Sequence, residues 1–152
     1  MKRLALGALL LLGASPASAG DDWVPSVRNE VVLKECGTCH MAFQPAFLPS
    51  RSWSRMMDGL ADHFGDDASL AADKVEIIRT YLTTNAGDVA MQGRARKYMQ
   101  WVAPGGTPQR ITENPDFLRK HRFPDSVWQA PNVMAKSNCM ACHPAADRGR
   151  YE

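Results

Sequence analysis

The sequence has no marked excess of charge of either sign. It contains 18 Lys and Arg residues against 16 Asp and Glu residues, a formal net charge of +2. Two of the basic residues, Lys2 and Arg3, belong to the leader described below, and without them the counts are 16 and 16. A face that binds nucleic acid needs a strong concentration of Lys and Arg. The charge balance therefore argues against nucleic acid as a partner.

Long apolar runs are also missing. The longest, residues 4–12, is about half of the roughly 20 residues that a membrane-spanning helix needs. It lies between two basic residues and a small-residue segment that ends in Ala-Ser-Ala at 17–19, which is the pattern of a secretory signal peptide rather than of an anchor. We expect residues 1–19 to be removed on Sec-dependent export to a bacterial periplasm.

Cysteine and histidine are scarce, with four residues of each. All four cysteines fall in two copies of Cys-x-x-Cys-His, the attachment signature of c-type haem. In this chemistry the two thiols add to the vinyl groups of one porphyrin, and the histidine binds its iron. The sequence therefore predicts two covalently bound haem c groups, whose attachment residues are Cys36 and Cys39 for the first and Cys139 and Cys142 for the second.

Other uses of paired cysteines fit the sequence less well. Two disulfides would suit an exported chain, but they do not explain the histidine after each pair. The knuckles of a zinc ribbon lie about 15–20 residues apart, whereas here about a hundred residues separate the motifs. A thioredoxin-like pair follows a strand, and no alternating pattern precedes either motif.

Two haems need four strong axial ligands, and the chain has four histidines. His40 and His143 belong to the motifs, which leaves His63 and His121. Proximity in sequence pairs His40 with His63 and His143 with His121, while crossed pairing would require the two halves to interleave. Methionine is the rival ligand, and the methionines free to compete are Met91, Met99 and Met134.

Apolar periodicity predicts a mainly α protein. We expect helices from about Ser26 into the first motif, over 53–64 with His63 in the last turn, and over 70–85, 90–102 and 115–121. A junction near residues 85–88 divides the chain into an N-terminal haem lobe (20–86) and a C-terminal haem lobe (87–152). Because the apolar residues are shared between two small lobes, the haems should supply much of the core.

Five segments of the sequence resemble one family closely. Residues 35–53, which contain the first motif, and Asp62-His63-Phe64-Gly65 are similar to the small periplasmic dihaem cytochrome c family, as are residues 110–112, 115–121 and 138–146 in the second half. The resemblance implies bis-histidine ligation at both haems, a first lobe like class I cytochrome c and a less regular second lobe. It also implies electron delivery to a soluble, high-spin, oxygen-binding monohaem cytochrome, often from a membrane cytochrome b.

Closed coordination at both irons favours a soluble one-electron carrier with low-spin haems of low potential. The alternatives are a haem enzyme, such as a peroxidase or an oxygen- or NO-handling protein with one open axial site, and a haem module that senses redox state. Three basic residues around His121 could neutralise haem propionates or face an acidic partner: Arg119, Lys120 and Arg122.

Overall fold

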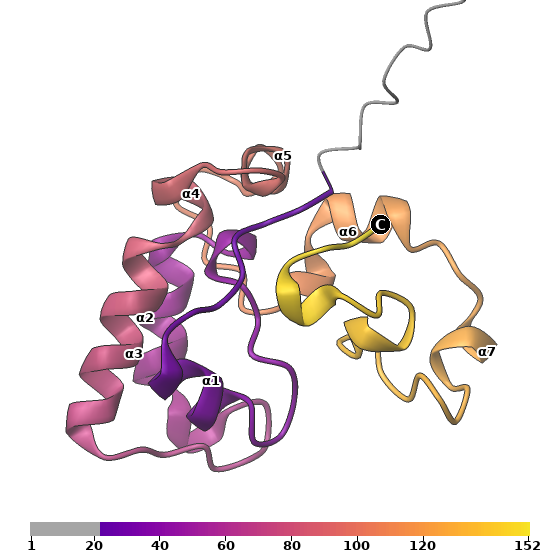
Figure 1. Cartoon of the computed structure of the whole chain (residues 1–152). Helices are drawn as coiled ribbons and strands as arrows, with labels where there is room; N and C mark the ends of the chain where they lie inside the picture. The colour runs from indigo at the N-terminus through magenta and orange to yellow at the C-terminus, as the bar shows by residue number, and fades with distance from the viewer. Residues whose placement is uncertain (1–21) are drawn as a thin grey trace, which may run out of the picture.

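The computed structural model describes residues 22–152, and the proposed signal peptide lies outside them. The described chain is mainly helical, and its only β pairing consists of isolated bridges (Figure 1). The α-helices are α1 (Glu30–Cys36), α2 (Ser50–Asp58), α3 (Ala72–Thr84), α4 (Gly87–Ala90), α5 (Ala95–Met99), α6 (Pro115–Lys120) and α7 (Asp125–Trp128). Short 3-10 turns are η1 (Pro45–Phe47), η2 (Leu60–Asp62), η3 (Ile111–Glu113), η4 (Cys139–Ala141) and η5 (Ala146–Arg148). Among these residues no helix has both the length and the apolar character to cross a membrane.

The first core lies among α1, α2 and α3. Helices α2 and α3 pack along each other, and α1 contacts α3. Their buried side chains form one cluster with the loop after the first motif, and its members include Val27, Val32, Leu48, Trp53, Met57, Ile78 and Leu82. The Trp53 indole donates to the Pro45 carbonyl over 2.8 Å, so the ring is fixed as well as buried.

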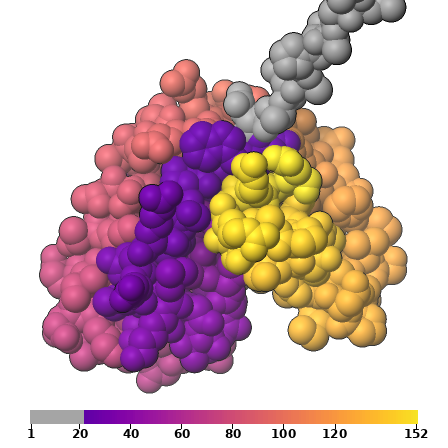
Figure 2. All heavy atoms as spheres, viewed as in Figure 1, coloured from indigo at the N-terminus to yellow at the C-terminus, as the bar shows by residue number. Residues whose placement is uncertain are grey.

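A second core joins the two halves of the sequence. Its buried members are Val24, Ala46, Phe47, Ala95, Tyr98 and Phe117. Helices α4 and α5 pack against η1 of the first half. Residues 22–24 pair with residues 149–151, where the Val24 amide donates to the Gly149 carbonyl over 2.9 Å. Figure 2 shows this N-terminal segment (indigo) against the C-terminal segment (yellow). Contacts thus cross the expected lobe boundary at residues 86 and 87, and the division into two lobes stays a prediction.

The first helix begins later than expected. Residues 22–29 are not helical, and the backbone of residues 22–24 pairs with 149–151. Asn29 is the N-cap of α1, and its side-chain oxygen accepts from the amides of Val31 and Val32. The expectation of a helix start at Ser26 is therefore wrong.

The expected helix over 90–102 is interrupted. Met91 and Gly93 have φ values of 50° and 54°, a left-handed conformation that ends α4 and separates it from α5. A Cβ at Gly93 would lie 2.3 Å from the Trp23 carbonyl. Glycine is needed here because the N-terminal segment passes so close.

Two other helices agree with the expectation. α3 covers 72–84 of the predicted 70–85. α6 covers 115–120 of the predicted 115–121, with Pro115 in its first turn and Asn114 as a side-chain N-cap. His121 follows directly as the C-cap, so α6 fixes the position of this histidine.

A buried ion pair holds α5 to α6. Arg94 donates to Asp116 over 2.9 Å and also to Asp22, and Arg119 donates to Asp116 over 2.6 Å. Both Arg94 and Asp116 are buried. Burial alone would raise the pKa of Asp116, but hydrogen bonds from Arg119 and Arg94 outweigh it and lower the pKa.

We expect Arg94→Leu to destabilise the holoprotein by about 3 kcal/mol, because it removes the buried partner of the Asp116 carboxylate and leaves only the more exposed Arg119. Since the folded-state pKa of Asp116 lies below its unfolded value of about 3.9, the wild-type contribution is complete above that pH and is lost as the pH falls through the folded value. Urea unfolding of the holoprotein between neutral pH and pH 3 measures both effects.

The matched control is Arg148→Leu, which removes an exposed arginine paired with Asp147 at 3.9 Å and should change the stability little. The double variant Arg94→Leu/Asp116→Leu should recover part of the loss, because no buried charge is left unpaired. Equal unfolding free energies for Arg94→Leu and the wild type would contradict the assignment.

Candidate functional site

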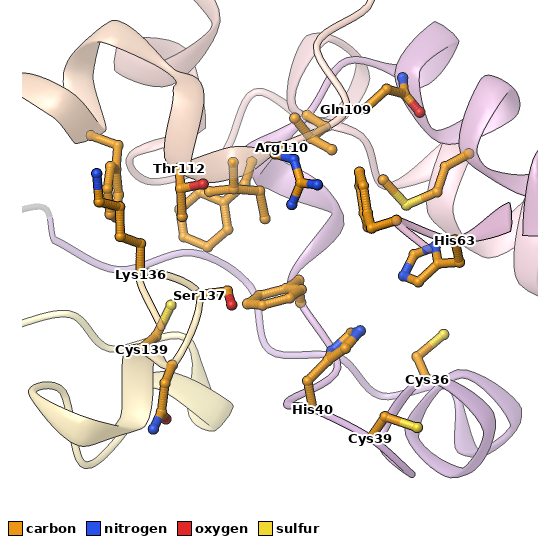
Figure 3. A pocket seen from close by; sticks show the side chains of 18 of the residues that line it. Cys36, Cys39, His40, His63, Gln109, Arg110, Thr112, Lys136, Ser137 and Cys139 are labelled. Carbon is orange, nitrogen blue, oxygen red and sulfur yellow. The ribbon is translucent and has the colours of Figure 1, made fainter. Parts of the chain in front are cut away.

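One large cavity connects the two halves of the molecule. It has a volume of about 890 Å³, near the upper end of the range of ligand sites, and its wall is mostly apolar. All eight predicted site residues line it: Cys36, Cys39, His40, His63, His121, Cys139, Cys142 and His143. In Figure 3 the side chains of His40 and His63 face each other beside Cys36 and Cys39, and Cys139 lies across the cavity. Sequence reasoning therefore found residues that the fold brings to one place.

The first histidine pair is formed by His40 and His63. Their ring centroids are 6.1 Å apart and their planes differ by 24°. His40 Nδ1 lies 2.8 Å from the Met41 carbonyl. If Nδ1 carries the proton and donates to this carbonyl, Nε2 is left as the free ligand atom.

His63 does not lie in a helix, and the expectation of a single helix over 53–64 is wrong. α2 ends at Asp58, Gly59 is its C-cap, and His63 follows the short turn η2. The His63 amide donates to the Asp66 carbonyl over 2.7 Å, and Asp62 accepts from the Gly65 amide. This tight turn, rather than helical periodicity, directs His63 toward His40.

The second pair is formed by His121 and His143. Their ring centroids are also 6.1 Å apart, but their planes differ by 73°. His121 is stacked on Phe117 with 4.0 Å between centroids, and its Nδ1 lies 3.0 Å from the Phe117 carbonyl. His143 follows η4, and its amide donates to the Cys139 carbonyl over 2.8 Å.

The two equal spacings fit an iron bound between the rings of each pair. An imidazole nitrogen lies about 2 Å from a first-row metal ion, and its own ring centre lies about 1 Å beyond that nitrogen, so two ligands on opposite sides have centroids about 6 Å apart. Ring contacts among the described residues include neither His40 with His121 nor His63 with His143. The geometry favours local over crossed pairing, and the residues fit two haem groups.

The electrostatics favour the neutral form of His63 and His121 and the protonated form of two motif cysteines. Burial, followed by the neighbouring histidine, lowers the pKa of His63; burial also lowers the pKa of His121. Both rings are therefore held neutral, the form that binds metal. Burial raises the pKa of the Cys139 thiol to about 11 and, together with Glu35, raises that of Cys36. A thioether carries no such proton, so covalent attachment would remove these ionisations.

The competing methionines lie elsewhere. Met91, Met99 and Met134 do not line the cavity; Met99 packs in the second core, and Met134 is 75% exposed. Met56 and Met57 of α2 do line it. They also pack against the first core, which is the ordinary role of methionine.

Basic residues reach the cavity wall from several elements. Of the three that flank His121, only Lys120 lines it, whereas Arg119 is paired with Asp116. Arg110 and Lys136 also line it, and the Arg110 guanidinium lies 3.9 Å from the centre of the Phe64 ring. Figure 3 shows Arg110 and Lys136 on the cavity wall.

Sequence reasoning missed two polar residues near the second pair. Gln44 is completely buried, and it accepts a hydrogen bond of 2.6 Å from the Tyr151 hydroxyl. Burial raises the pKa of Tyr151, so this hydroxyl stays protonated and able to donate. A glutamine in a proline-containing loop and a tyrosine near the end of the chain carry no periodic signal that would reveal their contact.

Comparison with known proteins agrees with this geometry. The family model for dihaem cytochrome c matches residues 32–151 and so includes all eight site residues. The chain belongs to the dihaem cytochrome c family. It accordingly carries two covalently bound haem c groups, for which the two Cys-x-x-Cys-His motifs supply the cysteines.

Solved structures of this family have the same fold. A dihaem cytochrome c from Rhodobacter sphaeroides is 39% identical, with a TM-score of 0.75 over 84% of this chain and 99% of that one. The dihaem cytochrome sb-DHC from Shewanella baltica is 30% identical, with a TM-score of 0.63 over 82% of this chain and 98% of that one. No curated protein gives a significant match.

Proposed function

We propose that this dihaem cytochrome carries single electrons between redox partners, with both haems low-spin and ligated by two histidines. The observation that carries the proposal is the pair of 6.1 Å spacings between facing imidazole rings. With both axial positions filled by protein, iron does not readily bind a substrate. Two imidazoles without a thioether ligand also give a low reduction potential.

The roles of the individual residues follow from their positions. Cys36 and Cys39 attach the first haem, which His40 and His63 ligate. Cys139 and Cys142 attach the second haem, which His143 and His121 ligate. The cavity-lining basic residues Arg110, Lys120 and Lys136 would offset the negative charge of the haem propionates.

The compartment and the partners belong to the same proposal. The leader of residues 1–19 supports Sec-dependent export to a bacterial periplasm, where the chain would work without a membrane span of its own. By resemblance to its family, it would receive electrons from a membrane cytochrome b and deliver them to a soluble high-spin monohaem cytochrome.

Spectra of the purified holoprotein test the ligation. The EPR spectrum of ferric low-spin haem depends on the angle between the axial imidazole planes. Because these angles are 24° and 73°, we expect two low-spin signals: a rhombic one from the nearly parallel pair, and a single large-g feature from the steeply inclined pair. The haem-to-protein ratio should be two.

The enzyme alternative makes the opposite prediction. An open or displaceable axial site would give a high-spin signal and would bind CO or cyanide without unfolding. A high-spin signal from the wild-type protein, or binding of CO or cyanide without unfolding, would contradict the proposal that protein ligands fill both axial positions of each iron. A methionine-to-iron charge-transfer band in the far red would contradict the all-histidine assignment.

A further inference from the structure

A buried polar contact joins the loop after the first motif to the segment after the second. Gln44, four residues after His40, donates from Nε2 to the Ala146 carbonyl over 2.7 Å and accepts from the Tyr151 hydroxyl over 2.6 Å. Gln44 is 0% exposed. An amide buried so deeply costs stability unless it is hydrogen-bonded, so this contact is a specific part of the packing.

Tyr151 is fixed at both its backbone and its side chain. Its amide donates to the Asp22 carbonyl over 3.0 Å, and its hydroxyl is fixed by Gln44. The aromatic ring then lies edge-on to two others: Phe47 at 5.2 Å and His143 at 5.5 Å between centroids. The ring of Tyr151 therefore has one position, and that position is against a proposed iron ligand.

His143 differs from the other motif histidine in how its ring is oriented. His40 has a carbonyl partner for Nδ1, and so does His121. The Nδ1 atom of His143 is buried and has no hydrogen-bond partner among the described residues. A metal-bound histidine is usually oriented by a hydrogen bond from its second nitrogen, so His143 needs another means.

We propose that Tyr151, held by Gln44, is a positioning residue that orients His143 by packing and keeps water away from the second iron. This rests on the proposed function, because it takes His143 as an iron ligand. The arrangement also ties the second haem to the loop of the first motif. Burial of the site and orientation of the axial ligand both set a haem potential, so the contact should act on the second haem selectively.

Three variants of the holoprotein test the proposal. Tyr151→Leu removes the ring edge from His143, and Tyr151→Phe keeps the ring but removes the hydroxyl bonded to Gln44. Tyr81→Phe is the matched control. The Tyr81 hydroxyl also takes part in one tertiary hydrogen bond, which it accepts from the Arg28 amide over 3.0 Å, and Tyr81 does not line the cavity. The readouts are the two reduction potentials, the two EPR signals and the melting temperature.

We expect Tyr151→Leu to lower the potential of the second haem, because water stabilises the more highly charged ferric state. The reduction equilibrium should change about tenfold, which is about 59 mV for one electron. The large-g EPR feature of the second haem should move or broaden, while the rhombic signal of the first stays. Tyr151→Phe should give a smaller shift in the same direction, and Tyr81→Phe should leave both potentials as in the wild type.

An unchanged second potential and EPR signal in Tyr151→Leu would overturn the proposal. So would equal shifts of both haems together with a lower melting temperature, which indicate general loosening. A Tyr151→Phe protein identical to the wild type in every readout would overturn the role of Gln44. Failure of the proposed function is visible separately, because it would appear in the wild-type spectra as a haem that is not six-coordinate and low-spin.

Discussion

His121→Ala is expected to leave the second iron five-coordinate and high-spin. The ring of His121 is the only one of the four histidine rings within contact distance of His143, at 6.1 Å, and the methionines free to compete lie outside the cavity. Because one haem of two is affected, about half of the ferric haem should become high-spin and bind CO after reduction. The potential of this haem should rise, since the loss of an imidazole destabilises the ferric state.

His63→Ala is the matched variant for the first haem. In it the rhombic EPR signal should disappear, whereas in His121→Ala the large-g feature should disappear. Added imidazole should restore the low-spin state in both variants, because it can occupy the space of the deleted ring. If His121→Ala instead removed the rhombic signal, the pairing would be crossed; if it stayed entirely low-spin, another ligand would bind the second iron.

The proposed ligand set follows from the sequence because haem attachment needs a fixed local motif, and because the chain has only two other histidines; the structure places these residues around one cavity. Helix α6 could also be predicted from the sequence, since Asn114 and Pro115 are local signals for a helix start. The path of the chain to His63 could not be predicted in this way. Apolar spacing over 53–64 fits one helix, but Gly59 ends α2 and the Asp62 side chain stabilises a turn instead.

Contacts between distant segments explain the other differences. The sequence predicts a helix from about Ser26, yet α1 begins at Glu30, after a segment whose first residues, 22–24, pair with residues 149–151. The close approach of Trp23 to Gly93 likewise accompanies the break between α4 and α5. Neither contact has a local signal, because each depends on how the chain folds around the cavity. The contact between Gln44 and Tyr151 also lacks a local signal, because 107 residues separate them.

The haem-free chain is expected not to fold to the native state. The cavity that joins the two halves measures about 890 Å³ and its wall is mostly apolar, so a haem-free chain would leave this apolar surface in contact with water. The net stability of a folded domain is only about 5–15 kcal/mol, so the loss of this burial is expected to prevent folding. The side chains around the cavity include core residues of both clusters, among them Trp53, Phe47 and Phe117. Without haem these side chains would face an open cavity.

The test is to produce the chain in a host that lacks haem ligation and to compare it with the holoprotein. We expect weak helical circular dichroism and no cooperative thermal transition, whereas the holoprotein should melt sharply. The double variant Cys139→Ser/Cys142→Ser distinguishes the contributions of the two haems to folding, because it can still attach the first haem. In that variant the first core of α1, α2 and α3 should retain its helical signal, while the second core, which contains Phe117, should loosen. Native-like dichroism with a sharp transition in the haem-free wild-type chain would contradict the prediction and would mean that the polypeptide closes the cavity by itself.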